Sequence, residues 1–123
     1  MALRIVRLGS PRHAGEGLRL GTVRRPPRGV RKADYARRNY YDVWLPDLAP
    51  SSRLVALAQK DWPGFTKAYR REMKAAAAER LIALLAALSQ DADFSVGCYC
   101  EEEERCHRSI LRELLAEHGA RLA

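Results

Sequence analysis

The sequence predicts a small α/β fold: a single domain over residues 1–123, in which helices cover a mainly parallel sheet of three or four strands. The first observation is that strand-like and helix-like segments alternate along the chain, which is typical of parallel sheets. The second is the size and composition. A chain of 123 residues, 47% hydrophobic and 30% charged, buries one core and is too apolar to be disordered.

Two short strands are predicted near the N-terminus. Residues 3–8 mix apolar and basic side chains and end at the turn residues Gly9-Ser10-Pro11. Residues 18–23 alternate with the period of two that a strand requires. The next segment, 24–32, holds two prolines and five basic residues, so we predict a surface loop there.

The middle of the chain predicts a short helix, a strand and a second helix. The short helix begins at Asp34 and ends near Asn39. Residues 40–45 are rich in aromatic and β-branched side chains and predict a third strand. Ser51 or Ser52 is the expected N-cap of the helix that follows.

The longest predicted helix runs from Asp61 to about Ser89. Pro63 suits an early helical position, and apolar residues recur at three- and four-residue steps, which predicts one buried stripe. This stripe consists of Phe65, Tyr69, Met73, Ala76 or Ala77, Leu81, Leu84, Leu85 and Leu88.

A last strand and a last helix complete the predicted fold. Residues 94–100 alternate as a strand and place Cys98 and Cys100 on one face. The acidic run 101–104 precedes a helix that ends with Gly119 as its C′ residue. The core-facing stripe of this helix is Ile110, Leu111, Leu114, Leu115 and His118.

Charge and cysteine content limit the class of protein. The net charge is +7, from 22 Lys and Arg against 15 Asp and Glu. The three cysteines are an odd number, which does not resemble the disulfide framework of a small secreted domain, so reduced thiols are expected. The longest apolar run is far shorter than the ~18 residues of a membrane span. We therefore expect a cytoplasmic protein without a membrane partner.

Two predicted strand ends carry unusual residues. Ligands of α/β sheets gather beyond the carboxyl ends of the strands, where the loop 24–32 and the segment 98–108 lie. If the two strands are neighbours, arginines from both segments converge on one pocket beside Cys106 and His107. These arginines are Arg24, Arg28, Arg105 and Arg108.

The cysteine segment has several interpretations. Cys98, Cys100, Cys106 and His107 have the side chains of a zinc site, but residues two apart in an extended strand are about 6.6 Å apart, so the strand has to bend at Tyr99. Cys98 alone fits a buried small hydrophobe. We therefore assign no metal and no cofactor, and keep a zinc-stabilised module as an alternative.

Cys106 also fits a nucleophile. In the first turn of the last helix, the helix dipole and the neighbouring basic residues favour a thiolate. The negative charge of the four glutamates 101–104 opposes a thiolate at Cys106 unless these side chains point outward. The alternative is that these glutamates only complement the helix N-terminus and that Cys106 is inert.

The basic loop is either an anion-binding segment or a solvated loop. Arg24 and Arg28 offer guanidinium groups that suit phosphate or carboxylate. Further basic residues can extend a nucleic-acid-binding face with tyrosines as stacking candidates, although charge alone gives non-specific affinity. The residues of this face are Arg37, Arg38, Lys67, Arg70, Arg71, Lys74, Tyr35, Tyr40 and Tyr41.

Several motifs resemble the YeaO-like branch of the domain of unknown function 488 family. They are Gly17-Leu18-Arg19-Leu20, Arg24-x-x-Pro27-Arg28-Gly29-Val30, Asp42-x-Trp44-Leu45-x-x-Leu48-Ala49-Pro50-Ser51 and Phe65-x-x-x-Tyr69-Arg70-x-Glu72-Met73. In the broader family a cysteine, any residue, a glutamate and a spacer precede cysteine-histidine-arginine. Here Cys98 fits the first cysteine and Cys106-His107-Arg108 the triplet, while Cys100 occupies the glutamate position. The resemblance implies a small α/β domain and one site, but no activity.

The leading hypothesis is an anion- or phosphate-binding pocket, interpreted further as that of an enzyme for a phosphorylated or nucleotide-like ligand. Arg24, Arg28 and Arg108 are the candidate anion-binding residues, and Cys106 and His107 the candidate catalytic pair. The expected partner is a small anionic ligand. The alternatives are a nucleic-acid-binding accessory protein and the zinc-stabilised module, and the sequence leaves the oligomeric state open.

Overall fold

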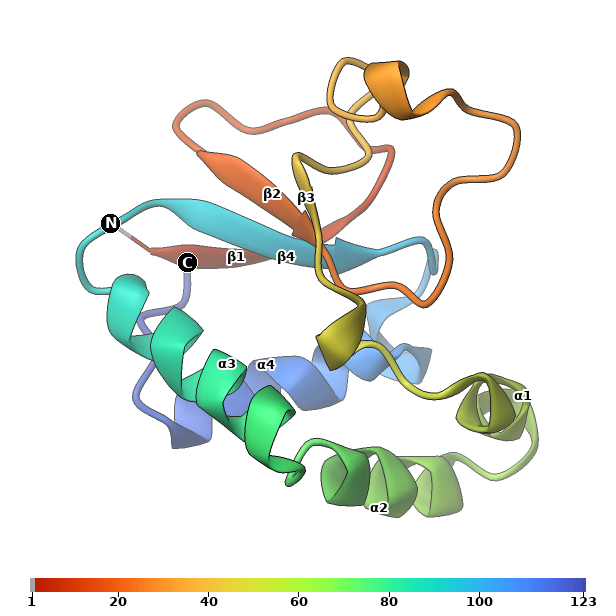
Figure 1. Cartoon of the computed structure of the whole chain (residues 1–123). Coiled ribbons are helices and arrows are strands. Elements are labelled where there is room, and N and C mark those ends of the chain that lie inside the picture. Colours follow the sequence, from red (N-terminus) through yellow and green to blue (C-terminus); the bar gives the residue numbers. More distant parts are fainter. Residues whose placement is uncertain (1) are drawn as a thin grey trace.

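The computed structural model describes residues 2–123, which form a four-stranded, wholly parallel sheet with helices packed against it (Figure 1). The small α/β fold predicted from the sequence is therefore confirmed. The strands are β1 (Leu3–Arg7), β2 (Leu18–Gly21), β3 (Val43–Trp44) and β4 (Phe94–Cys98), in the order β1-β4-β2-β3. None of the helices formed by these residues is long and apolar enough to cross a membrane.

The helices are α1 (Ser52–Lys60), α2 (Trp62–Glu72), α3 (Ala76–Leu88) and α4 (His107–Glu117). They lie on one side of the sheet, whereas the long loops after β1 and β2 lie on the other (Figure 1). All five residues of β4 are buried, because this strand lies between β1 and β2 in the sheet. The main core between sheet and helices includes Leu3, Phe65, Ile82, Val96 and Leu111.

The predicted helix from Asp61 to Ser89 is wrong, because the chain leaves the helix between α2 and α3. Ala75 has ψ 141°, an extended conformation, and Met73 is buried at the break. An unbroken helix would be about 40 Å long, more than twice the ~17 Å of a five-residue strand. Bending the chain at this point keeps both helices on the sheet.

The break also changes which side chains of α3 are buried. Leu84 and Leu88, expected in the core, are 52% and 43% exposed. Leu85 is buried as expected, while other apolar residues are buried in place of Leu84 and Leu88, because α3 has its own rotation about its axis. The buried residues of α3 are Ala78, Ile82, Leu85 and Ala86.

Several shorter elements differ from those predicted from the sequence. The helix expected over 34–39 is replaced by a 3-10 helix at Lys32–Asp34 and turns up to Asn39, whose φ is 65°. The strand expected over 40–45 is reduced to the two residues of β3. Gly119 has φ 85° directly after the end of α4, as expected of a C′ residue, but His118 is exposed rather than in the core.

A buried ion pair anchors the loops on the side opposite the helices. Arg19 of β2 is fully buried and donates from Nε and Nη2 to both carboxylate oxygens of Glu16, at 2.8 and 3.0 Å. Its Nη1 donates to the carbonyl oxygens of Ser10 and Asn39. Burial raises the pKa of Glu16, but hydrogen bonds from Arg19 and Ser95 outweigh it and lower that pKa to about 2.

Candidate functional site

The two unusual strand ends meet at one edge of the sheet. β2 and β4 are parallel neighbours, with Gly21 opposite Gly97, so the segments that follow them leave the sheet side by side. The pocket predicted between the two segments requires β2 and β4 to be neighbours in this way. Residues of both segments, among them Arg24, Cys106 and His107, line a common cavity there.

The chain bends at Tyr99, immediately after β4 ends at Cys98. The bend is held by the Tyr99 hydroxyl, which donates to the carbonyl oxygen of Arg25 at 2.8 Å. As a result, the sulfur atoms of Cys98, Cys100 and Cys106 all lie within 4.8 Å of one another. The bend thus brings the sulfur atoms of Cys98 and Cys100 closer together than the two residues would be in an extended strand.

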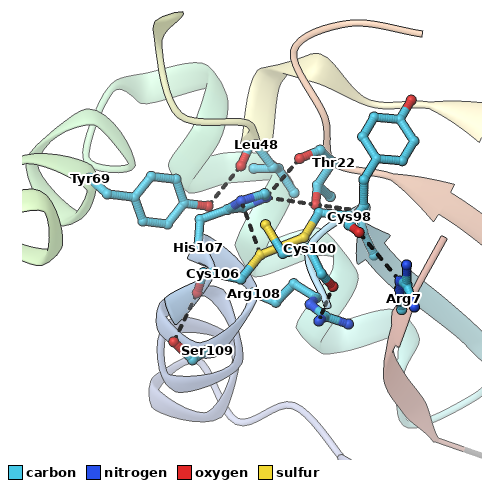
Figure 2. The surroundings of a disulfide bond; sticks show 12 residues. Arg7, Thr22, Leu48, Tyr69, Cys98, Cys100, Cys106, His107, Arg108 and Ser109 are labelled. Atoms are coloured by element: carbon cyan, nitrogen blue, oxygen red, sulfur yellow. Dashed lines mark hydrogen bonds between the residues drawn. A yellow bond between two sulfur atoms is a disulfide. The ribbon is translucent and has the colours of Figure 1, made fainter. Parts of the chain in front are cut away.

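The structure joins Cys98 and Cys106 as a disulfide and leaves Cys100 as an exposed free thiol (Figure 2). The sequence had predicted reduced thiols throughout. The Cα atoms of the bonded pair are 7.9 Å apart, wider than the 4.4–6.8 Å that disulfides usually span, so this backbone suits the dithiol form better. Cys98 packs beside Leu8 and Val23 in a small buried cluster, as expected for a small hydrophobe.

His107 is held with one nitrogen facing Cys106. Cys106 is the N-cap of α4 and His107 is its first residue. Nε2 of His107 lies 2.7 Å from the carbonyl oxygen of Thr22, and because a carbonyl only accepts, Nε2 carries the proton. Nδ1 therefore presents its lone pair, and it lies 3.7 Å from Cys106 Sγ (Figure 2).

Burial favours the neutral form of this imidazole. It lowers the pKa of His107 to about 4, and the nearby Arg108 charge adds to this, while the hydrogen bond to Thr22 opposes it. The ring also packs edge-on against Tyr69, with the ring centres 5.6 Å apart. The Tyr69 hydroxyl donates to the Leu48 carbonyl oxygen at 2.7 Å, and burial raises the pKa of Tyr69.

A cavity of about 560 Å³ opens beside the cysteines, a size common for small-molecule sites. Its polar lining includes Arg24, Arg25, Arg105, Cys106 and His107. The apolar part of the lining includes Val23, Val55, Ala58 and Phe65. None of the lining residues in the described part of the chain is Asp or Glu.

The acidic run does not face this cavity. Glu101, Glu102 and Glu104 are exposed, and Glu103 accepts hydrogen bonds from Arg112 at 3.0 and 3.1 Å. The condition set for a Cys106 thiolate, that these glutamates point outward, is therefore met for the three exposed ones, and none of the four lines the cavity. Glu103 and Glu104 lie in a 3-10 helix, Glu103–Arg105, which was not predicted from the sequence.

The candidate anion-binding arginines are separated. Arg24 lines the cavity and donates to the carbonyl oxygens of Ala49 and Pro50, at 3.0 and 3.2 Å. Arg28 is exposed on its loop and does not line the cavity. Arg25, overlooked in the sequence, does line it; the only available signal was its place in the basic loop.

Arg108 is buried next to Cys100 and is not among the residues that line the cavity. Its guanidinium is buried, and Nη2 donates to the carbonyl oxygen of Cys100 at 2.7 Å. Burial lowers the pKa of Arg108. Among residues 2–123, Nε of Arg108 has no hydrogen-bond partner and no carboxylate forms a salt bridge with it.

Several members of the predicted nucleic-acid-binding face make contacts within the fold: Tyr35 packs against Tyr41 and Tyr40 against Tyr99, and Arg37 pairs with Asp34. Tyr41 is buried in the small cluster beside Cys98 and Cys106, so its ring is not available for stacking. Arg70 forms ion pairs with Glu113 and Glu117, at 2.8 and 3.0 Å. Nucleic-acid binding stays a prediction, to which Tyr41 and Arg70 do not contribute free side chains.

Comparison with known proteins gives one result. The family DUF488-N3a, described as the active DUF488-N3 subclade, matches residues 3–119. No curated protein and no solved structure gives a significant match. The matched range includes all the cavity-lining residues and the whole cysteine segment.

Proposed function

Since the chain belongs to the DUF488 family, through its active DUF488-N3 subclade, we propose that it is a cysteine-dependent enzyme acting on a small anionic ligand. Cys106 is the nucleophile and His107 the base. The observation that carries this proposal is the contact of 3.7 Å between Cys106 Sγ and the unprotonated Nδ1 of His107. The description of the subclade as active supports a catalytic rather than a purely structural role.

The chemistry follows from the tautomer of His107. The step requires the reduced chain, in which Cys106 is a thiol: as its Sγ forms a bond to the electrophilic atom of the ligand, the thiol proton moves to Nδ1. The bond to the leaving group breaks, and the same proton then passes from Nδ1 to that group. The carbonyl oxygen of Thr22 keeps the ring in place and accepts a stronger hydrogen bond while the imidazolium exists.

The arginines of the cavity support an anionic ligand. Arg24, Arg25 and Arg105 contribute positive charge to the lining, and the acidic run faces solvent. Guanidinium groups bind phosphate and carboxylate with paired hydrogen bonds. The mainly apolar remainder of the lining suits the uncharged part of a small molecule.

Two alkylating agents of similar size test this proposal. Iodoacetate is an anion and iodoacetamide is neutral, and both attach to a thiolate with loss of iodide. Peptide-resolved mass spectrometry of the reduced chain gives the rate at Cys106. We expect the ratio of iodoacetate to iodoacetamide rates to exceed that of free cysteine by about tenfold, because the arginines concentrate the anion.

Variants test separately the attraction of the anion by the arginines and the activation of Cys106 by His107. Arg25→Ala and Arg105→Ala should each lower the rate ratio, whereas His107→Gln should slow both agents at Cys106. Lys67→Ala, on an exposed part of α2, is the matched control and should change neither. A Cys106 that is unreactive, or that prefers the neutral agent as strongly as free cysteine does, overturns the proposal.

A further inference from the structure

The three clustered sulfurs point to a metal-binding site. The sulfur atoms of Cys98, Cys100 and Cys106 lie within 4.8 Å of one another. Two thiolates on one tetrahedral Zn²⁺, each about 2.3 Å from the metal, lie about 3.8 Å apart. We propose that the reduced chain binds one zinc ion through these three sulfurs and Nδ1 of His107.

The backbone suits a metal better than it suits a bond between two of the sulfurs. The Cα atoms of Cys98 and Cys106 are 7.9 Å apart, beyond the usual 4.4–6.8 Å span of a disulfide. A metal ion between two sulfurs allows the wider separation. The bend at Tyr99 brings the Cys100 sulfur to the same point, so three thiolates converge from one short segment and one helix start.

His107 is oriented as a fourth ligand. Its Nδ1 lies 3.7 Å from Cys106 Sγ and carries the lone pair, because Nε2 donates its proton to the Thr22 carbonyl oxygen. Metal-bound histidines almost always donate their second ring nitrogen to a carboxylate, a carbonyl or water. The mutual distance of 4.8 Å holds for the three sulfurs and does not include His107, so in our proposal the ring moves from its place beside Cys106 to bring Nδ1 onto the metal as the fourth ligand.

The charge of such a site is balanced by Arg108. Three thiolates and one neutral imidazole on Zn²⁺ carry a net charge of −1. The buried guanidinium of Arg108 donates to the Cys100 carbonyl oxygen at 2.7 Å and forms no salt bridge with a carboxylate within residues 2–123. A buried cation is costly unless anions lie near it; the Glu103 charge acts on this guanidinium from beyond salt-bridge distance, and the zinc-thiolate group adds a nearer anionic partner.

Zinc binding has a consequence for catalysis. The metal ion takes up both Cys106 and His107, so the zinc-bound chain lacks a free nucleophile and a free base. This consequence rests on the proposed function, whereas zinc binding itself does not. Zinc and substrate then compete for one site, and removing the metal restores activity.

The test uses the full chain, reduced and freed of metal under an inert atmosphere. Zn²⁺ is added and the excess removed by dialysis, and Co²⁺ serves as a spectroscopic probe. We expect one metal per chain, and a cobalt spectrum with thiolate charge-transfer bands and the visible bands of a tetrahedral site. Cys100→Ser removes an exposed thiol and is expected to keep the fold, which far-ultraviolet circular dichroism checks.

The variants identify the ligands. Cys98→Ser, Cys100→Ser and Cys106→Ser should each weaken zinc binding by about 100-fold or more, because loss of an outer-shell partner alone costs about 10–100-fold. His107→Gln should change the cobalt spectrum, while His118→Gln, an exposed histidine at the far end of α4, should not. Zinc uptake well below one per chain, or a folded Cys100→Ser with unchanged affinity, overturns the inference.

The remaining outcomes distinguish the two proposals. If the reduced chain takes up no metal and re-forms only a Cys98–Cys106 disulfide in air, the cluster is a redox pair and the zinc site is wrong. If zinc binds but metal-free Cys106 shows no anion-directed reactivity, the proposed function fails and the metal site stands. If both hold, added zinc should stop alkylation of Cys106 at one equivalent.

Discussion

Nε2 of His107 donates to the carbonyl oxygen of Thr22 at 2.7 Å, which ties the first residue of α4 to the end of β2. The Thr22 hydroxyl lies 3.2 Å from the same nitrogen and donates to the Gly97 carbonyl oxygen at 3.0 Å. The Thr22 carbonyl is therefore the nearer acceptor for the ring, while the hydroxyl lies within hydrogen-bond distance of the ring and also bonds the neighbouring strand. The two groups of Thr22 can be separated, because a valine keeps the carbonyl and lacks the hydroxyl.

Thr22→Val should leave the tautomer of His107 unchanged. The variant loses the hydroxyl bond to Gly97, which costs about 1 kcal/mol in the free energy of unfolding, but it keeps the carbonyl that accepts from Nε2. Nitrogen NMR shifts of the His107 ring give the tautomer, and urea unfolding gives the stability. A ring that shifts its proton to Nδ1 in Thr22→Val contradicts the assignment.

Cys100 should be the first cysteine to react with iodoacetamide in the reduced, metal-free chain. Cys100 is exposed, whereas Cys98 and Cys106 are each only 2% exposed, and a buried thiol is reached less often. Timed alkylation followed by peptide mass spectrometry measures all three rates. Cys100→Ser is the control and should remove the fast phase alone; labelling of Cys98 at the same rate would count against the described fold.

Arg19→Met should destabilise the protein by about 3–5 kcal/mol, because it leaves the Glu16 carboxylate buried without its partner. The double variant with Glu16→Gln should recover a large part of this loss, since no uncompensated charge remains. Arg37→Met is the control: Arg37 forms an exposed ion pair with Asp34 and should change stability by less than about 0.5 kcal/mol. Urea unfolding measures all of them, and equal effects of Arg19→Met and Arg37→Met would refute the buried pair.

Acid should destabilise the fold through Glu16. Its pKa is about 2 in the folded chain and 4.5 as an ordinary glutamate, so the unfolded chain binds more protons between these values. The stabilisation by Glu16 is therefore complete above pH 4.5 and is lost as the pH falls toward 2. Unfolding free energies of the wild type and Glu16→Gln across this range test it. Parallel pH profiles for the two proteins would show that Glu16 makes no such contribution.

Gly17→Ala and Gly29→Ala form a matched pair. Both glycines have positive φ, 77° and 75°, a conformation that costs a residue with a Cβ about 1–2 kcal/mol. A Cβ on Gly17 would also collide with the carbonyl oxygen of Asp93, whereas one on Gly29 meets nothing within 4 Å. We expect Gly29→Ala to cost about 1 kcal/mol and Gly17→Ala about 3 kcal/mol or more. Thermal unfolding compares them, and equal losses would contradict the close approach at Gly17.

The sequence by itself determined the class of the fold and the segment that carries the chemistry. Strand and helix periodicity are local properties, so the parallel sheet and the last helix with its Gly119 C′ residue could be predicted from neighbouring residues. The motifs also identified the family, because they too are short and contiguous. The YeaO-like branch and a cytoplasmic location stay predictions.

Only the tertiary structure decided which of the candidate residues meet. The bend at Tyr99 depends on a hydroxyl bond to Arg25, and the tautomer of His107 depends on Thr22, 85 residues earlier in the chain. The break between α2 and α3 lies in a strongly helix-forming stretch, so packing on the short sheet overrides local preference there. Periodicity reports only a residue's own helix or strand, whereas these contacts join segments that are distant in sequence. The same reason explains why Arg25 entered the site, while Arg28 stayed in solvent and Arg108 became buried next to Cys100.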